Sequence, residues 1–150
     1  MSYIIIGSDH GGFELKKCIV DHLQNKCKKY IITDIGVFSD ASIDYPDICR
    51  KLINTYYETL KKSNDVFCIV ICGTGIGVSI SCNKYHNIRC ALCHNKYTAE
   101  MAKKHNNANV IAIGGRIITV SDASDIVDTY IQTQFEGGRH QRRLDKIEQY

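Results

Sequence analysis

The stretch "VFCIVICGTGIGVSI", residues 66–80, constrains the fold more than any other part of the chain. It begins with an unbroken apolar run, continues through three alternating glycines and returns to apolar residues. Such a run is typical of a strand buried on both faces of a parallel sheet. The glycines predict a tight strand-to-helix turn whose backbone amides can converge on an anion. A plain tight turn without a ligand remains the alternative.

Other apolar runs alternate with helical periodicity along the chain. Strands are expected at 3–7, 31–35, 66–72, 89–93 and 110–113. Helices are expected around the stripe Leu15, Ile19, Leu23 and Cys27, after Pro46, and at 77–84, 96–105, 121–134 and 139–149. Strands that alternate with helices imply right-handed crossovers. The pattern therefore predicts an α/β fold: a Rossmann-like, three-layer α/β/α sandwich around a five-stranded parallel sheet.

The chain is expected to form one domain over residues 1–150, because it contains neither a linker-like tract nor a repeat. Its apolar content of 44% is enough for a packed core. A formal charge of +3 gives little support to nucleic-acid binding and suits a small anionic substrate equally well. No apolar run approaches the length of a membrane span.

The eight cysteines do not indicate disulfides, because nothing in the first residues resembles a secretion signal. We expect reduced thiols and a cytoplasmic protein. Cys90 and Cys93 have zinc-like spacing, but in a strand they would point to opposite faces. Cys68 and Cys72 share a face, yet four strand residues separate them by roughly 13 Å. The sequence therefore predicts no metal site.

Polar side chains follow every expected strand, and the carboxyl ends of parallel strands meet at one edge of a sheet, where ligands bind. The candidates after the five strands are Asp9 and His10; Asp44 and Tyr45; Cys72, Gly73, Thr74, Gly75, Ile76 and Gly77; His94 and Asn95; and Arg116. They combine acids, imidazoles, a thiol, a hydroxyl and a guanidinium. This concentration predicts a catalytic or binding site at that edge.

Cys72 stands where a strand meets amide donors and a helix N-terminus, a position that favours a thiolate. It is either a usable base or nucleophile, or ordinary core filler like the other cysteines. Near the C-terminus, Arg139 and Arg143 lie one helical turn apart and share a face. They form either a bidentate phosphate clamp or a solvated basic turn. His105 ends a helix, where it could simply act as a cap.

Six motifs carry a resemblance to a known family over essentially the whole chain. They are "GSDHGGFELK", "DYPD", "CGTGIGVSISCNK", "IRCALC", "KKHNNANVIAIGGR" and "FEGGRHQRR". In this order they resemble the type B ribose-5-phosphate isomerases, part of a wider family that includes allose- and galactose-6-phosphate isomerases. Some members replace the cysteine with a glutamate later in the glycine loop. Here Cys72 is present and Val78 occupies that vicinity, so the chain resembles the thiol-base branch.

The resemblance implies a cofactor-free interconversion of ribose 5-phosphate and ribulose 5-phosphate through an enediolate, in the non-oxidative pentose phosphate pathway. It implies that Cys72 would transfer the proton between C1 and C2 and that Thr74 would transfer a proton between O1 and O2. The backbone amides of residues 73–77 would form an oxyanion hole. His105 would assist ring opening, and Asp9 and Asn106 would hold the sugar. The phosphate group would be held by His10, Arg116, Arg139 and Arg143.

The resemblance also implies homodimers with sites shared across the interface, the helix at 139–149 packing on the partner subunit. Whether dimers pair into tetramers stays open. So does the substrate, because pocket depth would separate a five-carbon from a six-carbon sugar phosphate. An alternative function of another class is that of a non-catalytic phosphate- or nucleotide-binding domain, which would use the glycine loop only to hold phosphate. No nucleic acid or membrane partner is expected.

Overall fold

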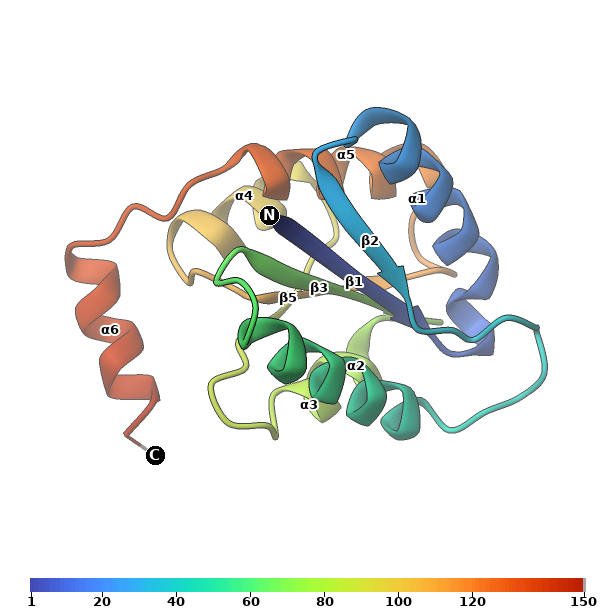
Figure 1. Cartoon of the computed structure of the whole chain (residues 1–150), viewed down its shortest axis with the longest axis horizontal. Helices are drawn as coiled ribbons and strands as arrows, with labels where there is room; N and C mark the ends of the chain where they lie inside the picture. Colours follow the sequence, from blue (N-terminus) through green and yellow to red (C-terminus); the bar gives the residue numbers. More distant parts are fainter. Residues whose placement is uncertain (150) are drawn as a thin grey trace.

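The computed structural model describes residues 1–149 and shows a five-stranded parallel sheet between two layers of helices (Figure 1). The strands are β1 (Ser2–Ser8), β2 (Tyr30–Asp34), β3 (Val66–Cys72), β4 (Cys90–Leu92) and β5 (Val110–Gly114). Their order across the sheet is β2-β1-β3-β5-β4, and every neighbouring pair is parallel. The predicted fold class is confirmed.

The helices are the short η1 (His10–Gly12), α1 (Phe13–Lys26), α2 (Tyr45–Leu60), α3 (Ile76–Cys82), α4 (Lys96–Lys104), α5 (Val120–Gln132) and α6 (Arg139–Ile147). The apolar residues of α1, α4 and α5 pack on one face of the sheet, and those of α2 and α3 pack on the other. Within residues 1–149, no helix has the length and apolar character needed to cross a membrane.

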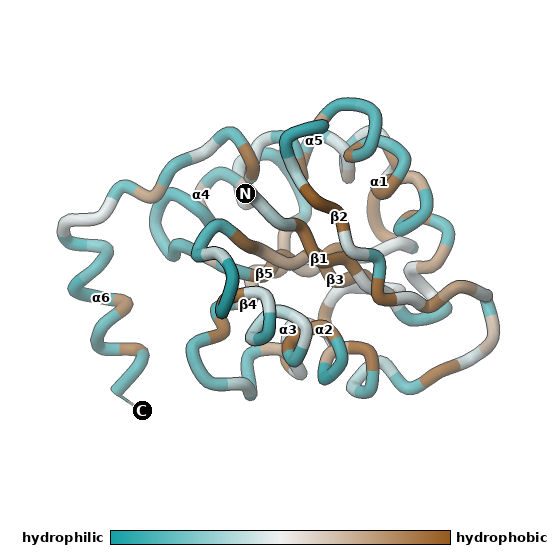
Figure 2. The backbone as a smooth tube through the Cα atoms, in the orientation of Figure 1, coloured by the Kyte–Doolittle hydropathy of each residue, from teal (hydrophilic) through white to brown (hydrophobic). Residues whose placement is uncertain are grey.

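The central strand β3 supplies both halves of the core. Phe67, Ile69 and Ile71 face α1, α4 and α5, whereas the alternate residues from Val66 to Cys72 face α2 and α3. All seven residues of β3 are buried, and the central strands are the most hydrophobic part of the backbone in Figure 2. This two-sided burial is the reason that the strand reads as one continuous apolar run.

The predicted faces of these four cysteines are confirmed. Cys90 packs with the core cluster on the α2–α3 face, whereas Cys93 belongs to the cluster on the opposite face. Cys68 and Cys72 share the α2–α3 face. The predicted ends of all five strands, β4 included, are right to within one residue.

The C-terminal helix α6 stands apart from the sandwich in Figure 1, after a linker at 133–138. It touches the rest of the chain through His140 and Leu144, which are both buried, while most of its other residues are exposed. Its packing on a partner subunit stays a prediction.

A buried ion pair links α1 to the end of β2. Lys16 is 1% exposed, and its Nζ donates to both carboxylate oxygens of Asp34 at 2.7 and 2.6 Å. Asp34 also accepts from the amide of Gly36 at 2.9 Å, at the start of the loop that leaves the sheet. The pair therefore positions this loop as well as α1.

We expect Asp34→Ala to lower the free energy of unfolding by about 2–3 kcal/mol, because the Lys16 ammonium would stay buried without a partner. Lys16→Met should cost less, because Asp34 is a quarter exposed and keeps its amide donor. Urea denaturation of both variants measures the difference. Equal losses would show that the buried cation is not what makes the aspartate necessary.

Candidate active site

The sequence-predicted site lies where the order of the strands reverses. From β1 the chain crosses to β2 on one side, and then returns to β3 on the other side of β1. Crossovers on opposite sides leave a crevice between the carboxyl ends of β1 and β3, the usual ligand position in such sheets. Asp9 and His10 follow β1, and Gly73 and Thr74 follow β3, so four predicted residues border this crevice.

Asp9 stabilises the turn that follows β1 and borders this crevice. It is buried, and its Oδ1 accepts from the amides of Gly11 and Gly12 at 2.8 and 3.2 Å, which caps η1. The glycines allow the close approach: a Cβ on Gly12 would lie 2.6 Å from the carbonyl oxygen of Ile71. Because both hydrogen bonds use Oδ1, Oδ2 can accept from a ligand hydroxyl.

The glycine loop holds the thiol of Cys72. The loop turns through Gly75, whose φ of +78° belongs to the left-handed region that favours glycine. This turn brings the Gly75 amide to the sulfur, to which it donates at 3.1 Å. Cys72 is 5% exposed at the base of the loop, and Thr74 above it is exposed. Amide donation to sulfur strengthens when the sulfur carries charge.

Three other thiols, those of Cys49, Cys68 and Cys93, are fully buried core groups. Desolvation by burial raises the pKa of Cys68 well above its ordinary value. The hydrogen bond that the Cys49 thiol donates to Cys82, together with burial, raises the pKa of Cys49. On the other face, burial raises the pKa of Cys93 to about 12. These three side chains remain protonated thiols at neutral pH, in agreement with their reading as packing residues.

Arg116 lies against the glycine loop. The amide of Gly115 donates to the carbonyl of Cys72 at 2.8 Å, and the amide of Arg116 donates to that of Gly73 at 2.9 Å. A Cβ on Gly73 would lie 3.0 Å from an Arg116 guanidinium nitrogen. The end of β5 thus brings an exposed cation to the crevice, as predicted.

The loop between β2 and α2 covers the other side of the crevice. The ring Nδ1 of His10 accepts from the amide of Ile43 at 3.2 Å, which places the proton of a neutral ring on Nε2. The Tyr45 ring lies over Gly77, where an added Cβ would be 2.8 Å away. A pocket of about 450 Å³ opens here, lined among others by Asp9, His10, Asp44 and Tyr45.

A second group of predicted residues lies elsewhere in the chain. His105 and Asn106 lie in the short turn between α4 and β5, so they lie at the amino edge of the sheet, whereas Cys72 pairs with Gly114 at the carboxyl edge. The strand between these edges is about 13 Å long. The linker before α6 joins the amino-edge group, because the Glu136 amide donates to the Lys104 carbonyl at 3.0 Å. One chain therefore does not bring the two groups together.

One member of the amino-edge group, His140, was not predicted as a site residue. His140 stacks on His105 with ring centroids 4.2 Å apart and an interplanar angle of 13°. The exposed Arg139 and Arg143 flank it on α6. Nothing in the local pattern distinguishes His140 from its basic neighbours, because the contact joins two helices that are distant in sequence.

The crevice fits one class of proteins: open α/β enzymes that bind a small anionic ligand at the switch point of a parallel sheet. Comparison with known proteins narrows that class. Residues 4–147 match the family model described as Ribose/Galactose Isomerase, and the chain belongs to this family.

Individual relatives cover almost the whole chain. The ribose-5-phosphate isomerase B of Mycolicibacterium paratuberculosis is 43% identical over 98% of this chain and 90% of its own length. That of Escherichia coli is 38% identical, over 98% and 95%. The crystal structure of ribose-5-phosphate isomerase B from Mycoplasma genitalium with bound ribulose 5-phosphate superposes with a TM-score of 0.89 at 42% identity, covering 99% of this chain and 95% of that one.

Proposed function

We propose that this protein interconverts ribose 5-phosphate and ribulose 5-phosphate through an enediolate, with Cys72 as the base. The observation that carries the proposal is the meeting of a thiol, a glycine loop and Asp9 at the switch point of the sheet. The relatives support the substrate, since their names and the ribulose 5-phosphate complex all concern this pair of sugars. The assignment places the protein in the pentose phosphate pathway.

The carboxyl-edge group performs the proton transfers. With the aldose open, the Cys72 thiolate removes the proton from C2, and the electron pair moves to form the enediolate. The exposed Thr74 hydroxyl passes a proton between O1 and O2, and Cys72 returns its proton to C1. Amides of 73–77 stabilise the oxyanion, an effect worth about 3–4 kcal/mol per donor in comparable sites. No cofactor is required.

Residues around Cys72 and the glycine loop bind the remaining groups of the substrate. Asp9 holds a sugar hydroxyl through Oδ2. Asp44 on the covering loop and Tyr45 at the start of α2 hold the other hydroxyls. Arg116, and His10 through Nε2–H, supply positive or donor groups beside the crevice. Such contacts fix the reacting carbon against the thiolate.

The amino-edge group acts on the substrate of a second protomer. General acids and bases work within hydrogen-bond reach of the atoms they serve, and the strand length between Cys72 and His105 of one chain exceeds that reach. We therefore propose a homodimer in which His105 and Asn106 of one subunit, with Arg139 and Arg143, complete the site at the carboxyl edge of the other. His105 opens the furanose ring, and the arginines bind the phosphate.

Exposed apolar side chains beside the crevice support an interface there. Ile76 and Ile80 lie one turn apart on α3 and are 51% and 59% exposed, and Ile117 after β5 is 55% exposed. Covering them with a second subunit would remove apolar surface from water. Eight free cysteines agree with a reducing, cytoplasmic location.

Incubation with ribose 5-phosphate, without added metal or nucleotide, tests the proposal. We expect ketose to form, and to form more efficiently than from allose 6-phosphate. A higher kcat/KM for allose 6-phosphate would move the assignment to a six-carbon substrate. Binding without turnover of either sugar would favour a phosphate-binding domain.

His105→Gln should separate the two directions of the reaction. Ribose 5-phosphate must be opened before C2 can be deprotonated, so we expect its kcat/KM to fall about 100-fold. Ribulose 5-phosphate is already acyclic, and the initial rate from the ketose should fall much less. Initial rates in both directions measure the asymmetry. Equal losses would assign His105 to the proton transfer itself.

A further inference from the structure

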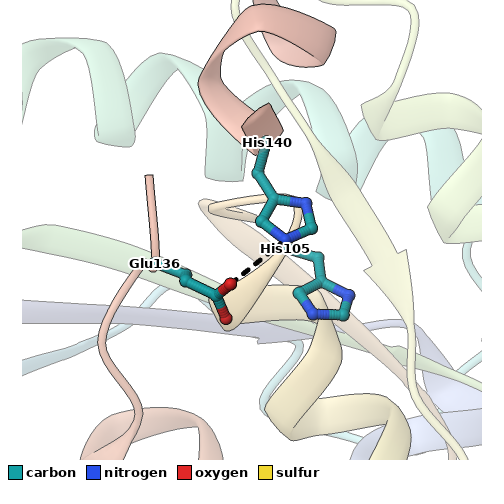
Figure 3. Close-up of side chains that lie close together, drawn as sticks. All are labelled: His105, Glu136 and His140. Carbon is teal, nitrogen blue, oxygen red and sulfur yellow. Dashed lines mark ion pairs between the residues drawn. The ribbon is translucent and has the colours of Figure 1, made fainter. Parts of the chain in front are cut away.

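Three side chains at the base of α6 gather around a common point (Figure 3). His105 ends α4, Glu136 lies in the linker, and His140 lies in the first turn of α6. One ligand-type atom from each lies within 4.8 Å of the other two. The proposed isomerisation uses His105 alone of the three.

The His140 side chain has a buried nitrogen without a hydrogen-bond partner. His140 is 5% exposed, and within residues 1–149 no protein atom hydrogen-bonds its Nε2. Glu136 Oε1 lies 3.6 Å from this nitrogen, too far for a hydrogen bond. Two ligand atoms bound to one tetrahedral zinc ion lie about 3.4 Å apart. The spacing therefore fits an ion between the two atoms.

We infer that His105, Glu136 and His140 form a binding site for a zinc-like divalent cation, and that the bound cation inhibits the enzyme by holding the His105 ring. Two imidazoles, one carboxylate and an open fourth position are a ligand set that zinc accepts, whereas calcium and magnesium require more oxygen ligands. The inhibition, though not the binding, rests on the proposed function.

Two contacts around the site affect how these side chains can bind a cation. The two rings are stacked, so His105, which is only partly buried, has to tilt out of the stack to aim a nitrogen at the ion. Arg139 lies 3.5 Å from Glu136 Oε1, competes for it and weakens binding.

Titration calorimetry with zinc chloride tests the site directly. We expect one zinc ion per chain at micromolar affinity, and at least a tenfold loss of affinity in Glu136→Gln. This variant is nearly isosteric, and Glu136 is 38% exposed, so folding should be preserved; circular dichroism checks it. The matched control is Glu58→Gln, which should bind zinc as the wild type does. Glu58 is an exposed carboxylate on α2, and its partner within residues 1–149 is Lys61.

Cobalt substitution distinguishes metal binding at this site from metal binding at the cysteines, several of which are partly exposed. A His–Glu–His site gives cobalt ligand-field bands without thiolate charge-transfer absorption. A thiolate spectrum, or equal zinc affinity in Glu136→Gln and the wild type, would overturn the site.

Assays of isomerase activity with zinc complete the test. Glu136 is not part of the proposed sugar-phosphate machinery, so Glu136→Gln should keep its basal rate and resist zinc concentrations that inhibit the wild type. Equal inhibition of both would overturn the inference. A protein that binds zinc in a Glu136-dependent way but does not isomerise ribose 5-phosphate would instead refute the proposed function and leave the zinc site intact.

Discussion

Cys72→Ala should lower kcat about 1000-fold or more and leave the affinity for ribose 5-phosphate nearly unchanged. Proton abstraction from C2 needs a base within hydrogen-bond reach, and such groups contribute about 10²–10⁴-fold to the rate. The sulfur is held at the base of the glycine loop by the Gly75 amide, and alanine supplies no proton acceptor there. The phosphate and hydroxyl contacts proposed above involve other residues, so binding should survive.

The matched control is Cys68→Ala, four residues earlier on the same face of β3 and fully buried. It removes the same atom from the core and should cost some stability but little activity. Steady-state rates, direct binding of the substrate and exchange of solvent deuterium into the sugar distinguish the two variants. Near-normal exchange in Cys72→Ala would refute the thiol as the base.

The predicted glycine loop and central strand were accessible from sequence because their signals are local. Residues 66–72 are buried on both faces, and Gly75 stands at a positive φ that few other residues tolerate. The position of the site followed from a general property of parallel sheets, since Asp9 and the glycine loop each end a strand.

The order of the strands was not accessible, because periodicity shows that a segment is a strand but not which strand it pairs with. β5 lies between β3 and β4, which the alternation of elements alone does not specify. The opposite edges of His105 and Cys72 do not depend on this order, because His105 precedes β5 and Cys72 ends β3 in a sheet whose strands are all parallel. The order decides which strand ends flank the crevice between β1 and β3.

The burial of two polar side chains could not be predicted from the sequence, for a related reason. Lys16 follows Leu15 on α1 and would ordinarily be read as exposed, yet it is buried because Asp34 comes from the neighbouring strand. His140 sits in a basic run and is buried by its stacking on His105. In both cases the partner is distant in sequence, and a single sequence carries no record of such a pair.

We propose that each active site combines the carboxyl edge of one protomer with the amino edge of another. Cys72→Ala and His105→Gln each disable one of these contributions, so either homodimer should be strongly impaired with ribose 5-phosphate. In a heterodimer of the two variants, one site contains both substitutions and the other contains neither. Mixing the variants should therefore restore activity that neither has alone.

The decisive measurement is the ribose 5-phosphate isomerase rate after the two purified variants are unfolded together, refolded as an equimolar mixture and compared with each variant refolded alone. For random assortment in a two-fold symmetric dimer, half of the dimers are mixed and each has one intact site, so the account predicts about a quarter of the wild-type rate. A rate no higher than the mean of the two variants, in a mixture shown to contain heterodimers, would contradict the shared site.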